Sequence, residues 1–482
     1  LFNGLLAWLA EQGHTNTAFV AGHTRDAEAA LQAARAASTD IAATAQACGL
    51  DVAAVEKFFA MFGAAERVVT LFSQGVTQSS AGAAKVNSII NCHLLTGRIG
   101  RRGMGPFSIT GQPNAMGGRE VGGLANQLAA HLRLEDPAHR LALQEFWGSP
   151  RMADKPGLKA VDLFDAIDAG RIKAVWIMAT NPVVSLPDAD RARRALQRCP
   201  LVIVSDCVAA NDTLPFAHIR LPAAGWGEKD GTVTNSDRHV SRQRAFLPLP
   251  GSARPDWWII CEIARRLGFA AGFDFTGPSA IFDEYARLTS LPRGFGMHLD
   301  LQGMGGLNQQ QYDAITPRQW PVPAMQGEPM RPFADGYFPT PDGRARFIAT
   351  PARGPRHPPT DEYPLILNTG RIRDQWHTMT RTARAAALNS HEPEPYVDAN
   401  RQDLAIAGAV PGDLVRVVSR WGSALARVRA SGDVPAGMLF MPIHWSDQFA
   451  GSARVGAVVN PVVDALSGEP EFKHTPARIE RV

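Results

Sequence analysis

Apolar residues recur at helical spacing near the start of the chain. Leu5 and Leu9 form one such set, and Val55, Phe59 and Phe62 form another. A spacing of three or four residues places these side chains on one face of a helix. The pattern predicts that residues 1–66 are helical and that these side chains belong to a core.

Short β-branched runs alternate with further helical patterns in the next part of the chain. The predicted strands are residues 67–72, 173–178 and 201–204, and the predicted helices are residues 81–95, 158–169 and 188–197. This alternation is typical of a doubly wound α/β fold, in which helices cover a parallel sheet. Ligands of such sheets bind at the carboxyl ends of the strands.

The regular period is lost between Gly268 and about Pro359, where Gly, Pro and Gln are frequent. We expect an irregular surface connection with one helix near residues 281–288. Short apolar runs separated by Gly and Pro turns follow and predict a small β-barrel. The predicted parts are residues 1–105, part of an α/β domain; 106–268, a second α/β domain; 269–360, the connection; and 361–482, the barrel domain.

The composition describes an ordinary soluble globular chain, with 482 residues, 45% hydrophobic residues and 20% charged residues. The net charge of +3 is too small to indicate nucleic-acid binding. No apolar run is long enough to span a bilayer, and no signal peptide is visible. Five scattered cysteines without a C-x-x-C pair are a poor disulfide framework and a poor iron–sulfur site. We interpret them mostly as buried thiols in a reducing cytoplasm, and we predict no metal ligand.

A glycine-rich segment lies at residues 111–123. Its five glycines and Pro113 do not favour a helix or a strand. Gln112 and Arg119 add amide and guanidinium donors, which suit a small oxyanion. Composition alone permits either an ordinary surface turn or a loop that approaches a ligand.

The amino-acid sequence of this segment resembles the active-site loop of nitrate reductases in the molybdopterin oxidoreductase (DMSO reductase) superfamily. The segments 75–78 and 94–100 extend the resemblance to the assimilatory type. The resemblance implies an oxidoreductase of nitrate assimilation, which reduces nitrate at molybdenum held by two molybdopterin guanine dinucleotides. It also implies that Gln112 and Arg119 are catalytic. Arg119 would hold the anion, and Gln112 would hydrogen-bond nitrate or a metal oxygen.

Polar residues at the ends of predicted strands indicate a dinucleotide site. Asn181 ends one strand and Ser205 and Asp206 end the next, where a carboxylate can accept the N–H pair of guanine. Lys229, in a glycine-rich segment, could lie near phosphates, although a charged hairpin is the plainer alternative. Asp256 heads a predicted helix, where an N-cap is its plainer role. The family resemblance implies that all five residues bind the dinucleotide.

The predicted barrel domain supplies further candidates. After its first strand, Gly370 and Arg371 could grip a pyrophosphate through backbone amides and a guanidinium. Residues 405–413 resemble the double-psi β-barrel of the superfamily. Two glutamines after the strand at 67–72, Gln74 and Gln78, are further candidates for cofactor binding. Around the first barrel strand, the candidates are Thr369, Gly370, Arg371, His377 and Thr378. The family resemblance implies that Lys473 also reaches a pterin dinucleotide.

Two positions depart from the family pattern. Many relatives have Met where this chain has Gln74, so the surroundings of the metal can differ here. Gly456 matches an asparagine of many periplasmic relatives, and that contact is not carried over.

The chain begins with a helix that lies well inside the polypeptide in this family. A four-cysteine iron–sulfur domain precedes that helix in the relatives, usually with a cysteine that ligates molybdenum. We therefore expect the C-terminal majority of a larger cytoplasmic enzyme, with a [4Fe–4S] cluster in the preceding region. The expected partners are nitrate and an electron donor, which is ferredoxin, flavodoxin or an NAD(P)H-linked reductase subunit. We expect neither nucleic acid nor a membrane.

Three alternatives remain open from the sequence. A formate dehydrogenase of the same superfamily typically has a histidine near the polar pair, and none stands beside Gln112. A non-catalytic, cofactor-free scaffold of the same fold should lack Asp206, Lys229 and Arg371 together, and this chain has all three. The chain could also be an inert fragment.

Overall fold

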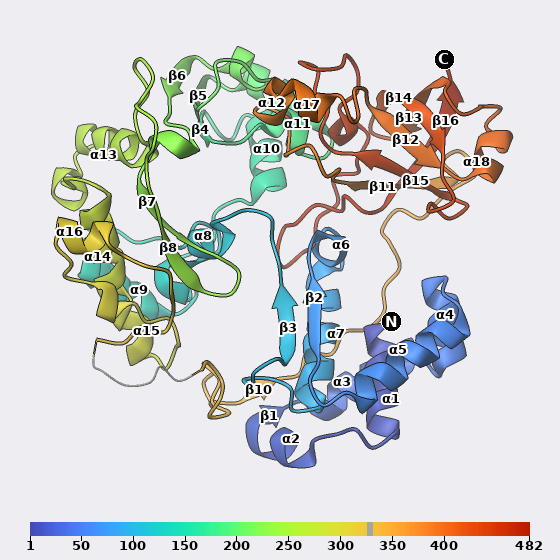
Figure 1. Ribbon diagram of the computed structural model, residues 1–482, viewed down its shortest axis with the longest axis horizontal. Helices are drawn as coiled ribbons and strands as arrows, with labels where there is room; N and C mark the ends of the chain where they lie inside the picture. The colour runs from blue at the N-terminus through green and yellow to red at the C-terminus, as the bar shows by residue number, and fades with distance from the viewer. Residues whose placement is uncertain (325–330) are drawn as a thin grey trace.

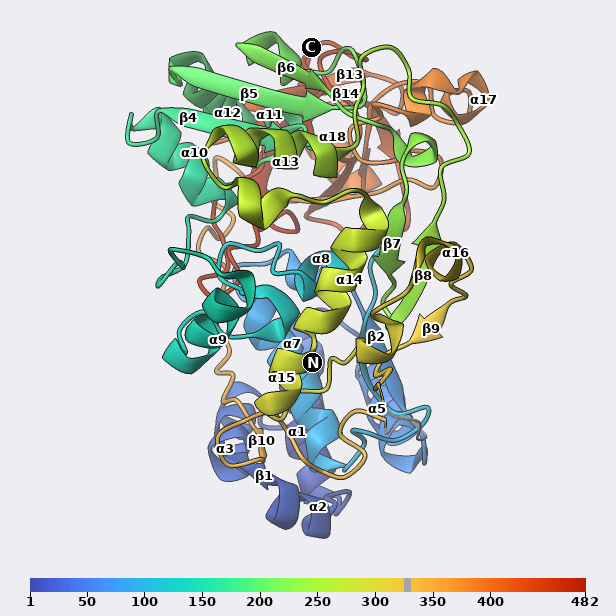
Figure 2. The ribbon, with the colours of Figure 1, turned by 90° about the vertical axis from the view of Figure 1, so that its left-hand side faces the viewer.

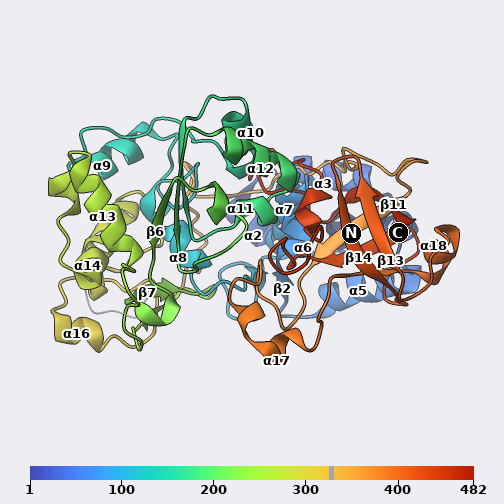
Figure 3. The same cartoon turned by 90° about the horizontal axis from the view of Figure 1, so that it is seen from above.

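The computed structural model describes residues 1–324 and 331–482 (Figure 1). The N-terminal helices lie at one end of the molecule, and the sheet of β4, β5 and β6 lies at the other, as Figures 1 and 2 both show. Seen from above, the C-terminal barrel lies at the opposite side from helices α9 (Pro137–Trp147), α13 (Asp256–Arg266) and α14 (Pro278–Leu288) (Figure 3).

The N-terminal residues form helices, as the apolar spacing predicts. Leu5, Leu9, Val55 and Phe59 are almost fully buried in a common core. The helices of this part are α1 (Phe2–Glu11), α2 (Thr17–His23), α3 (Ala27–Ala37), α4 (Ile41–Cys48), α5 (Val52–Ala64) and α7 (Gly82–Leu95). The short strand β1 (Thr24–Arg25) pairs in parallel with β10 (Ala345–Arg346).

The first predicted strand is β2 (Val69–Phe72), and a short helix, α6 (Gln74–Thr77), separates it from α7. β2 pairs in parallel with β3 (Gly105–Ser108). The carboxyl end of β3 therefore leads directly toward the glycine-rich segment at 111–123.

A second parallel sheet consists of β4 (Ala174–Met178), β5 (Leu201–Asp206) and β6 (Ile219–Pro222). The apolar side chains of β4 and β5 share a core with α10 (Ala160–Asp168) and α12 (Ala189–Arg198). The predicted strand–helix alternation is confirmed here. Two further helices, the short α11 (Pro182–Ser185) after β4 and the longer α13 (Asp256–Arg266), belong to this part of the chain.

The segment predicted as an irregular connection needs correction over residues 278–320. The expected helix is present as α14 (Pro278–Leu288), but α15 (Ser290–Gly294) and α16 (Gln309–Asp313) follow it. Leu299 and Tyr312 are buried in a core shared with Leu143 of α9 (Pro137–Trp147). Helices of five residues are too short to show a sequence period, which is why the pattern missed this packing.

Three antiparallel strands complete this region. β7 (Gly231–Thr234) and β8 (His239–Gln243) form a hairpin, and β9 (Arg318–Gln319) pairs with β8. β7 packs beside the short helix α8 (Ala115–Glu120). The hairpin therefore connects the predicted Lys229 motif with the glycine-rich segment.

The C-terminal residues form the predicted barrel, which is closed by six strands in the order β11-β15-β12-β14-β13-β16. Its core includes Leu367, Val397, Val417 and Leu439, all with no exposed area. The strands are β11 (Leu365–Gly370), β12 (Tyr396–Ala399), β13 (Leu414–Ser419), β14 (Ser423–Ala430), β15 (Met438–Pro442) and β16 (Thr475–Arg481), with helices α17 (Ala386–Asn389) and α18 (Arg401–Ile406) between strands.

All five cysteines are free thiols, but only three of them are buried. Cys48 and Cys207 are exposed, so the prediction of burial does not hold for these two. In the described part of the chain, no group of three His, Cys, Asp or Glu side chains could hold a metal ion. No helix within residues 1–324 and 331–482 has both the length and the apolar character needed to cross a membrane.

Candidate cofactor and substrate site

Predicted cofactor residues from the β4–β5 sheet meet residues of the barrel domain. Asn181 follows β4 directly, and its Nδ2 donates to Oγ1 of Thr378 at 3.2 Å. Its Oδ1 accepts from the hydroxyl of Thr213 at 2.7 Å. Asn181 and Thr378 are both buried. Because Thr378 lies in the loop after β11, the carboxyl edge of the sheet faces the barrel.

Asp206, at the end of β5, lines a cavity of about 380 Å³ together with Arg220, Pro250 and Ser252. Its Oδ2 accepts from Nδ2 of Asn211 at 2.9 Å. Burial raises the pKa of the Asp206 carboxyl, although backbone N–H donors and Arg381 oppose the shift. The cavity offers a carboxylate acceptor beside a guanidinium.

The hydroxyl of Ser205, which is predicted to bind the dinucleotide, is already hydrogen-bonded within the sheet. Ser205 is 1% exposed, and its Oγ accepts from Nε1 of Trp176 at 2.8 Å. The side chain therefore fastens β5 to β4. Any contact of Ser205 with a nucleotide would have to come from its backbone or a rearranged hydroxyl.

Lys229 and Asp256 contact each other. Nζ of Lys229 lies 2.8 Å from Oδ2 of Asp256, and both side chains are 29% exposed. Asp256 is the first residue of α13, while Pro255 is the N-cap residue, so the Asp256 side chain is not the helix cap. The lysine that is predicted to approach phosphates is thus held by a carboxylate.

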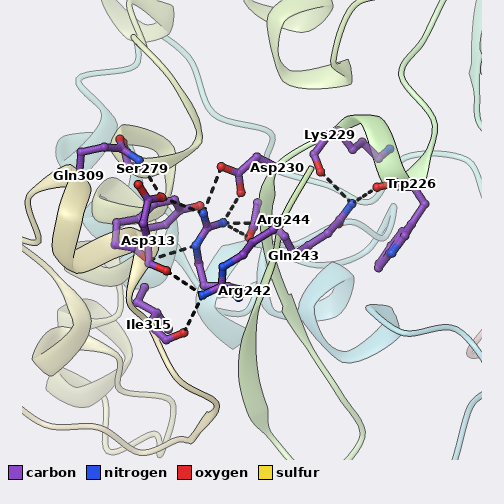
Figure 4. A network of polar contacts seen from close by, with 12 residues as sticks. Trp226, Lys229, Asp230, Arg242, Gln243, Arg244, Ser279, Gln309, Asp313 and Ile315 are labelled. Carbon is purple, nitrogen blue, oxygen red and sulfur yellow. Dashed lines mark hydrogen bonds and ion pairs between the residues drawn. The ribbon is translucent and has the colours of Figure 1, made fainter. Parts of the chain in front are cut away.

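Arg242, which the sequence interpretation overlooked, stabilises the segment around Lys229 (Figure 4). Its side chain is 2% exposed and pairs with Asp230, and its Nη1 donates to the carbonyl of Gly231 at 2.7 Å. Nε2 of the neighbouring Gln243 donates to the carbonyl of Lys229 at 3.2 Å. Residues of β8 therefore fix the backbone of the Lys229 segment. In the sequence, the opposite charges of Asp230 and Arg242 were the one signal that could have identified Arg242.

The carboxyl end of β11 meets the C-terminal segment. Thr369 donates its hydroxyl to the carbonyl of Phe472 at 2.9 Å, and Nζ of Lys473 donates to the carbonyl of Thr369. Burial lowers the pKa of the Lys473 ammonium. In the described residues, the buried Oδ1 of Asn368 has no hydrogen-bond partner. A half-buried cation and an unused acceptor thus flank the predicted Thr369–Gly370 site.

Arg371 reaches from the barrel to the glycine-rich segment. A Cβ built on Gly111 would lie 2.8 Å from Nη1 of Arg371, so the guanidinium lies close to the backbone of the glycine-rich segment. The guanidinium lies over the ring of Trp376, with 4.3 Å between Cζ and the ring centroid. The barrel and the glycine-rich segment are therefore neighbours at this point.

A buried histidine shapes the loop that carries His377. Nδ1 of His444 donates to the carbonyl of His377 at 2.7 Å, and Nε2 accepts from the backbone N–H of Ile372 at 3.0 Å. Burial lowers the pKa of His444 to about 4. Burial and the nearby Arg371 also lower the pKa of His377. Both imidazoles are therefore neutral near pH 7.

The two predicted glutamines lie around α6. Gln74 is the first residue of this helix and is exposed. Burial raises the pKa of Glu469, and the side chain of Gln78 opposes this shift. Oε1 of Glu471 accepts from the backbone N–H of Ser80 at 2.9 Å. The turn after α6 therefore packs on the segment that carries Lys473.

The glycine-rich segment is not a loop throughout, because residues 115–120 form α8. Gln112 is exposed and accepts a hydrogen bond from the hydroxyl of Thr110. Arg119 is exposed in the last turn of α8. Within residues 1–324 and 331–482, neither an ion pair of Arg119 nor a hydrogen bond between Gln112 and Arg119 is present. The guanidinium is therefore available to an anion.

The comparisons with known proteins agree with this architecture. The model of the "Molybdopterin oxidoreductase" family matches residues 12–266, and that of the "Molydopterin dinucleotide binding domain" matches residues 365–476. The chain belongs to the molybdopterin oxidoreductase family. The second match coincides with the closed barrel, so the two halves of the candidate site fall in the two matched regions.

Among curated relatives, this molybdopterin oxidoreductase is 47% identical to a nitrate reductase of Klebsiella oxytoca, over 99% of this chain and 54% of that protein. It is 32% identical to an F420-dependent formate dehydrogenase subunit alpha of Methanocaldococcus jannaschii, over 90% of this chain and 61% of that protein. The chain thus spans little more than half the length of these relatives.

A solved structure supports the fold. Acetylene hydratase from Pelobacter acetylenicus superposes with a TM-score of 0.74 at 15% identity, over 100% of this chain and 70% of that one.

Proposed function

We propose that the chain is the catalytic part of a nitrate reductase that reduces nitrate to nitrite at a molybdenum bis(molybdopterin guanine dinucleotide) centre. The observation that best supports this proposal is that residues of the two matched regions contact each other. Asn181 hydrogen-bonds to Thr378, and Gly111 lies beside Arg371. When bound, the metal–pterin group supplies two-electron transfer and accepts the oxygen atom. The greater identity to the Klebsiella nitrate reductase than to the formate dehydrogenase supports nitrate as the substrate.

The residues around the site fit a dinucleotide. Guanine offers two N–H donors, and Asp206 lines a cavity with carboxylate oxygens that can accept them. Phosphates need cations, which Lys229 and Arg371 can supply. The half-buried Lys473 and the unused Oδ1 of Asn368 provide a donor and an acceptor where β11 ends. In this proposal Gln74 and Gln78 complete the cofactor site, and Asp256 holds Lys229 beside it.

Arg119 and Gln112 would handle the substrate. An exposed guanidinium can hold a planar oxyanion through two parallel N–H donors. As charge develops during oxygen transfer, a positioned cation stabilises the transition state without reorganising. Gln112 would donate its amide N–H to an oxygen of nitrate.

Electrons must come from outside these residues. We propose a [4Fe–4S] cluster carried by another part of the enzyme, and a cytoplasmic donor that is ferredoxin, flavodoxin or an NAD(P)H-linked reductase subunit. The dispersed cysteines of the described chain support this assignment of the cluster, since a [4Fe–4S] centre needs four thiolates together.

Formate oxidation is the second candidate, because a formate dehydrogenase is 32% identical to this chain. Desolvation and the nearby Arg119 lower the pKa of His131, although part of its side chain is exposed. A neutral histidine therefore lies close to the proposed anion site, although none neighbours Gln112 in the sequence. Assays of one preparation with nitrate and with formate separate the two candidates.

The test of the substrate site is Arg119→Ala in the complete gene product loaded with cofactor. We expect kcat/KM for nitrate to fall roughly 100- to 1000-fold, as for the loss of one positioned donor. Bound molybdenum and guanine nucleotide should stay unchanged. Arg35→Ala, at an exposed arginine of α3, is the control and should retain activity. An unchanged kcat/KM in Arg119→Ala would refute the substrate role of Arg119.

A further inference from the structure

Glu120, the last residue of α8, is a buried carboxylate that the proposed function has not used. It has no exposed area, and it directly follows the exposed Arg119. Carboxylates are seldom fully buried unless each oxygen has a partner, because desolvation of the charge is costly. The contacts of Glu120 therefore need an explanation.

Three neutral donors satisfy the carboxylate. Oε1 accepts from Nε1 of Trp320 at 2.6 Å. Oε2 accepts from Oγ1 of Thr234 at 2.9 Å and from the hydroxyl of Tyr285 at 3.0 Å. Burial raises the pKa of Glu120, whereas these three hydrogen bonds lower it. One side chain thus joins α8 to β7, to α14 and to the segment after β9.

The opposite end of α8 is fixed on the same strand. Oδ1 of Asn114 accepts from the backbone N–H of Thr234 at 2.9 Å instead of capping the helix. A Cβ on Gly117 would lie 2.1 Å from Oδ1 of Asn114, so glycine is required for this contact. Both ends of α8 therefore contact Thr234.

A helix of six residues has little stability of its own, since nucleation is costly and few hydrogen bonds repay it. Two of these six residues are glycines, at positions 117 and 118, which lower helix propensity further. The orientation of α8 must therefore come from its tertiary contacts, which Asn114 and Glu120 supply.

Successive residues of a helix point about 100° apart, as follows from 3.6 residues per turn. When Glu120 is held in the core, Arg119 is turned toward the surface. Resting on the proposed function, we propose that Glu120 is a positioning residue, whose three hydrogen bonds orient α8 so that Arg119 holds the nitrate anion. Its carboxylate touches neither substrate nor cofactor.

A double-mutant cycle between the two neighbours tests this role. In the complete cofactor-loaded enzyme, we expect Glu120→Ala to lower kcat/KM for nitrate by tenfold or more, mainly through KM. A misplacement of about 1 Å can cost roughly 100-fold. In an Arg119→Ala background, the same substitution should change kcat/KM by less than about twofold, because the oriented group is already absent.

Conservative variants distinguish positioning from simple loss of stability. Glu120→Gln keeps an oxygen for Trp320 and should retain most of kcat/KM. Tyr285→Phe removes one hydrogen bond and should raise KM severalfold even if Glu120→Ala folds poorly. Tyr312→Phe is the matched control, because the Tyr312 hydroxyl is buried in the same core and has no hydrogen-bond partner in the described residues. It should leave KM unchanged.

The outcomes separate the two proposals. If Arg119→Ala lowers kcat/KM and Glu120→Ala lowers it by the same factor in both backgrounds, Glu120 acts independently and the positioning role is overturned. The same conclusion follows if neither Glu120→Ala nor Tyr285→Phe changes KM. If Arg119→Ala itself has no effect, the substrate role of Arg119 fails, and the positioning role fails with it.

Discussion

Lys229 offers a sharp test of the cofactor site, because the structure pairs its ammonium with Asp256 at 2.8 Å. The perturbation is a pair of variants, Lys229→Ala and Asp256→Asn. The first removes the cation and leaves the carboxylate without its partner. The second keeps the cation and releases it from the pair. If Lys229 binds phosphate of the cofactor, Lys229→Ala should lower the amount of retained nucleotide, whereas Asp256→Asn should not.

The magnitude follows from the exposure of the pair. Both side chains are 29% exposed, and a partly solvated ion pair is worth about 1 kcal/mol or less. A charge-assisted hydrogen bond to phosphate is worth about 1.5–3 kcal/mol. Lys229→Ala should therefore weaken dinucleotide binding roughly 10- to 150-fold. Exchanging Asp256 for phosphate costs the lysine little, so Asp256→Asn should hold the dinucleotide at least as well as the parent.

The assay is the amount of guanine nucleotide that denaturation releases per protein, counted by chromatography after exhaustive dialysis. Asp206→Ala, which removes the predicted guanine acceptor, should also lower this amount. Lys57→Ala, at an exposed lysine of α5, is the charge-matched control. Thermal unfolding of each variant shows whether the fold is retained.

A full complement of nucleotide in both Lys229→Ala and Asp206→Ala would refute the dinucleotide assignment. A loss in Asp256→Asn that equals the loss in Lys229→Ala would have another meaning. Asp256 would then bind the nucleotide itself, as the family resemblance implies, instead of only holding the lysine.

Two further predictions concern pH and iron. Burial lowers the pKa of His444 to about 4, against about 6.5 in the unfolded chain, so the unfolded state takes up the proton first as pH falls. As pH is lowered between these two values, the free energy of unfolding should therefore fall by about 1.4 kcal/mol per pH unit. Denaturant titrations of His444→Phe at several pH values should show a weaker dependence of this free energy on pH. An equal dependence in the parent and the variant contradicts the reasoning. A polypeptide of residues 1–482 alone should show neither the visible absorption of an iron–sulfur cluster nor nitrate reduction with an artificial reductant, because its described cysteines do not gather; either signal would contradict this.

Local patterns were sufficient for the elements with a clear period. The runs that became β4 and β5 are apolar over five and four residues respectively, and apolar positions of their neighbouring helices recur every three or four residues. Both signals arise within one element and need no knowledge of the rest of the chain. The barrel was predictable for the same reason, because each short strand is bounded by its own turn residues.

Side-chain contacts between distant segments were not predictable. Glu120 finds its donors 114, 165 and 200 positions further along the chain, so no motif contains them. The same contacts explain why the glycine-rich segment forms α8 despite its composition. Tertiary contacts there override a weak local propensity.

The functional residues fall between these two cases. Asn181 and Asp206 stand at strand ends, where a general rule for α/β sheets places ligands. Arg371 could be assigned to a phosphate, but its approach to Gly111 joins positions 260 residues apart and needs the folded chain. The positions of single residues were thus predictable, whereas their pairing across the site was not.

The closed barrel makes the proposed cofactor site at the end of β11 more rigid than the proposed substrate site on α8. β11 is paired on both sides, with β15 and with β16, so it can open only when whole rows of backbone hydrogen bonds break. Ile366 and Leu367, which are paired with both neighbours just before Thr369, should therefore have amides that exchange slowly with solvent. Arg119 sits on a helix of six residues held by side chains, which can open locally at lower cost. In the proposed enzyme, a rigid barrel strand would then bind the cofactor, and a more flexible short helix would bind the substrate.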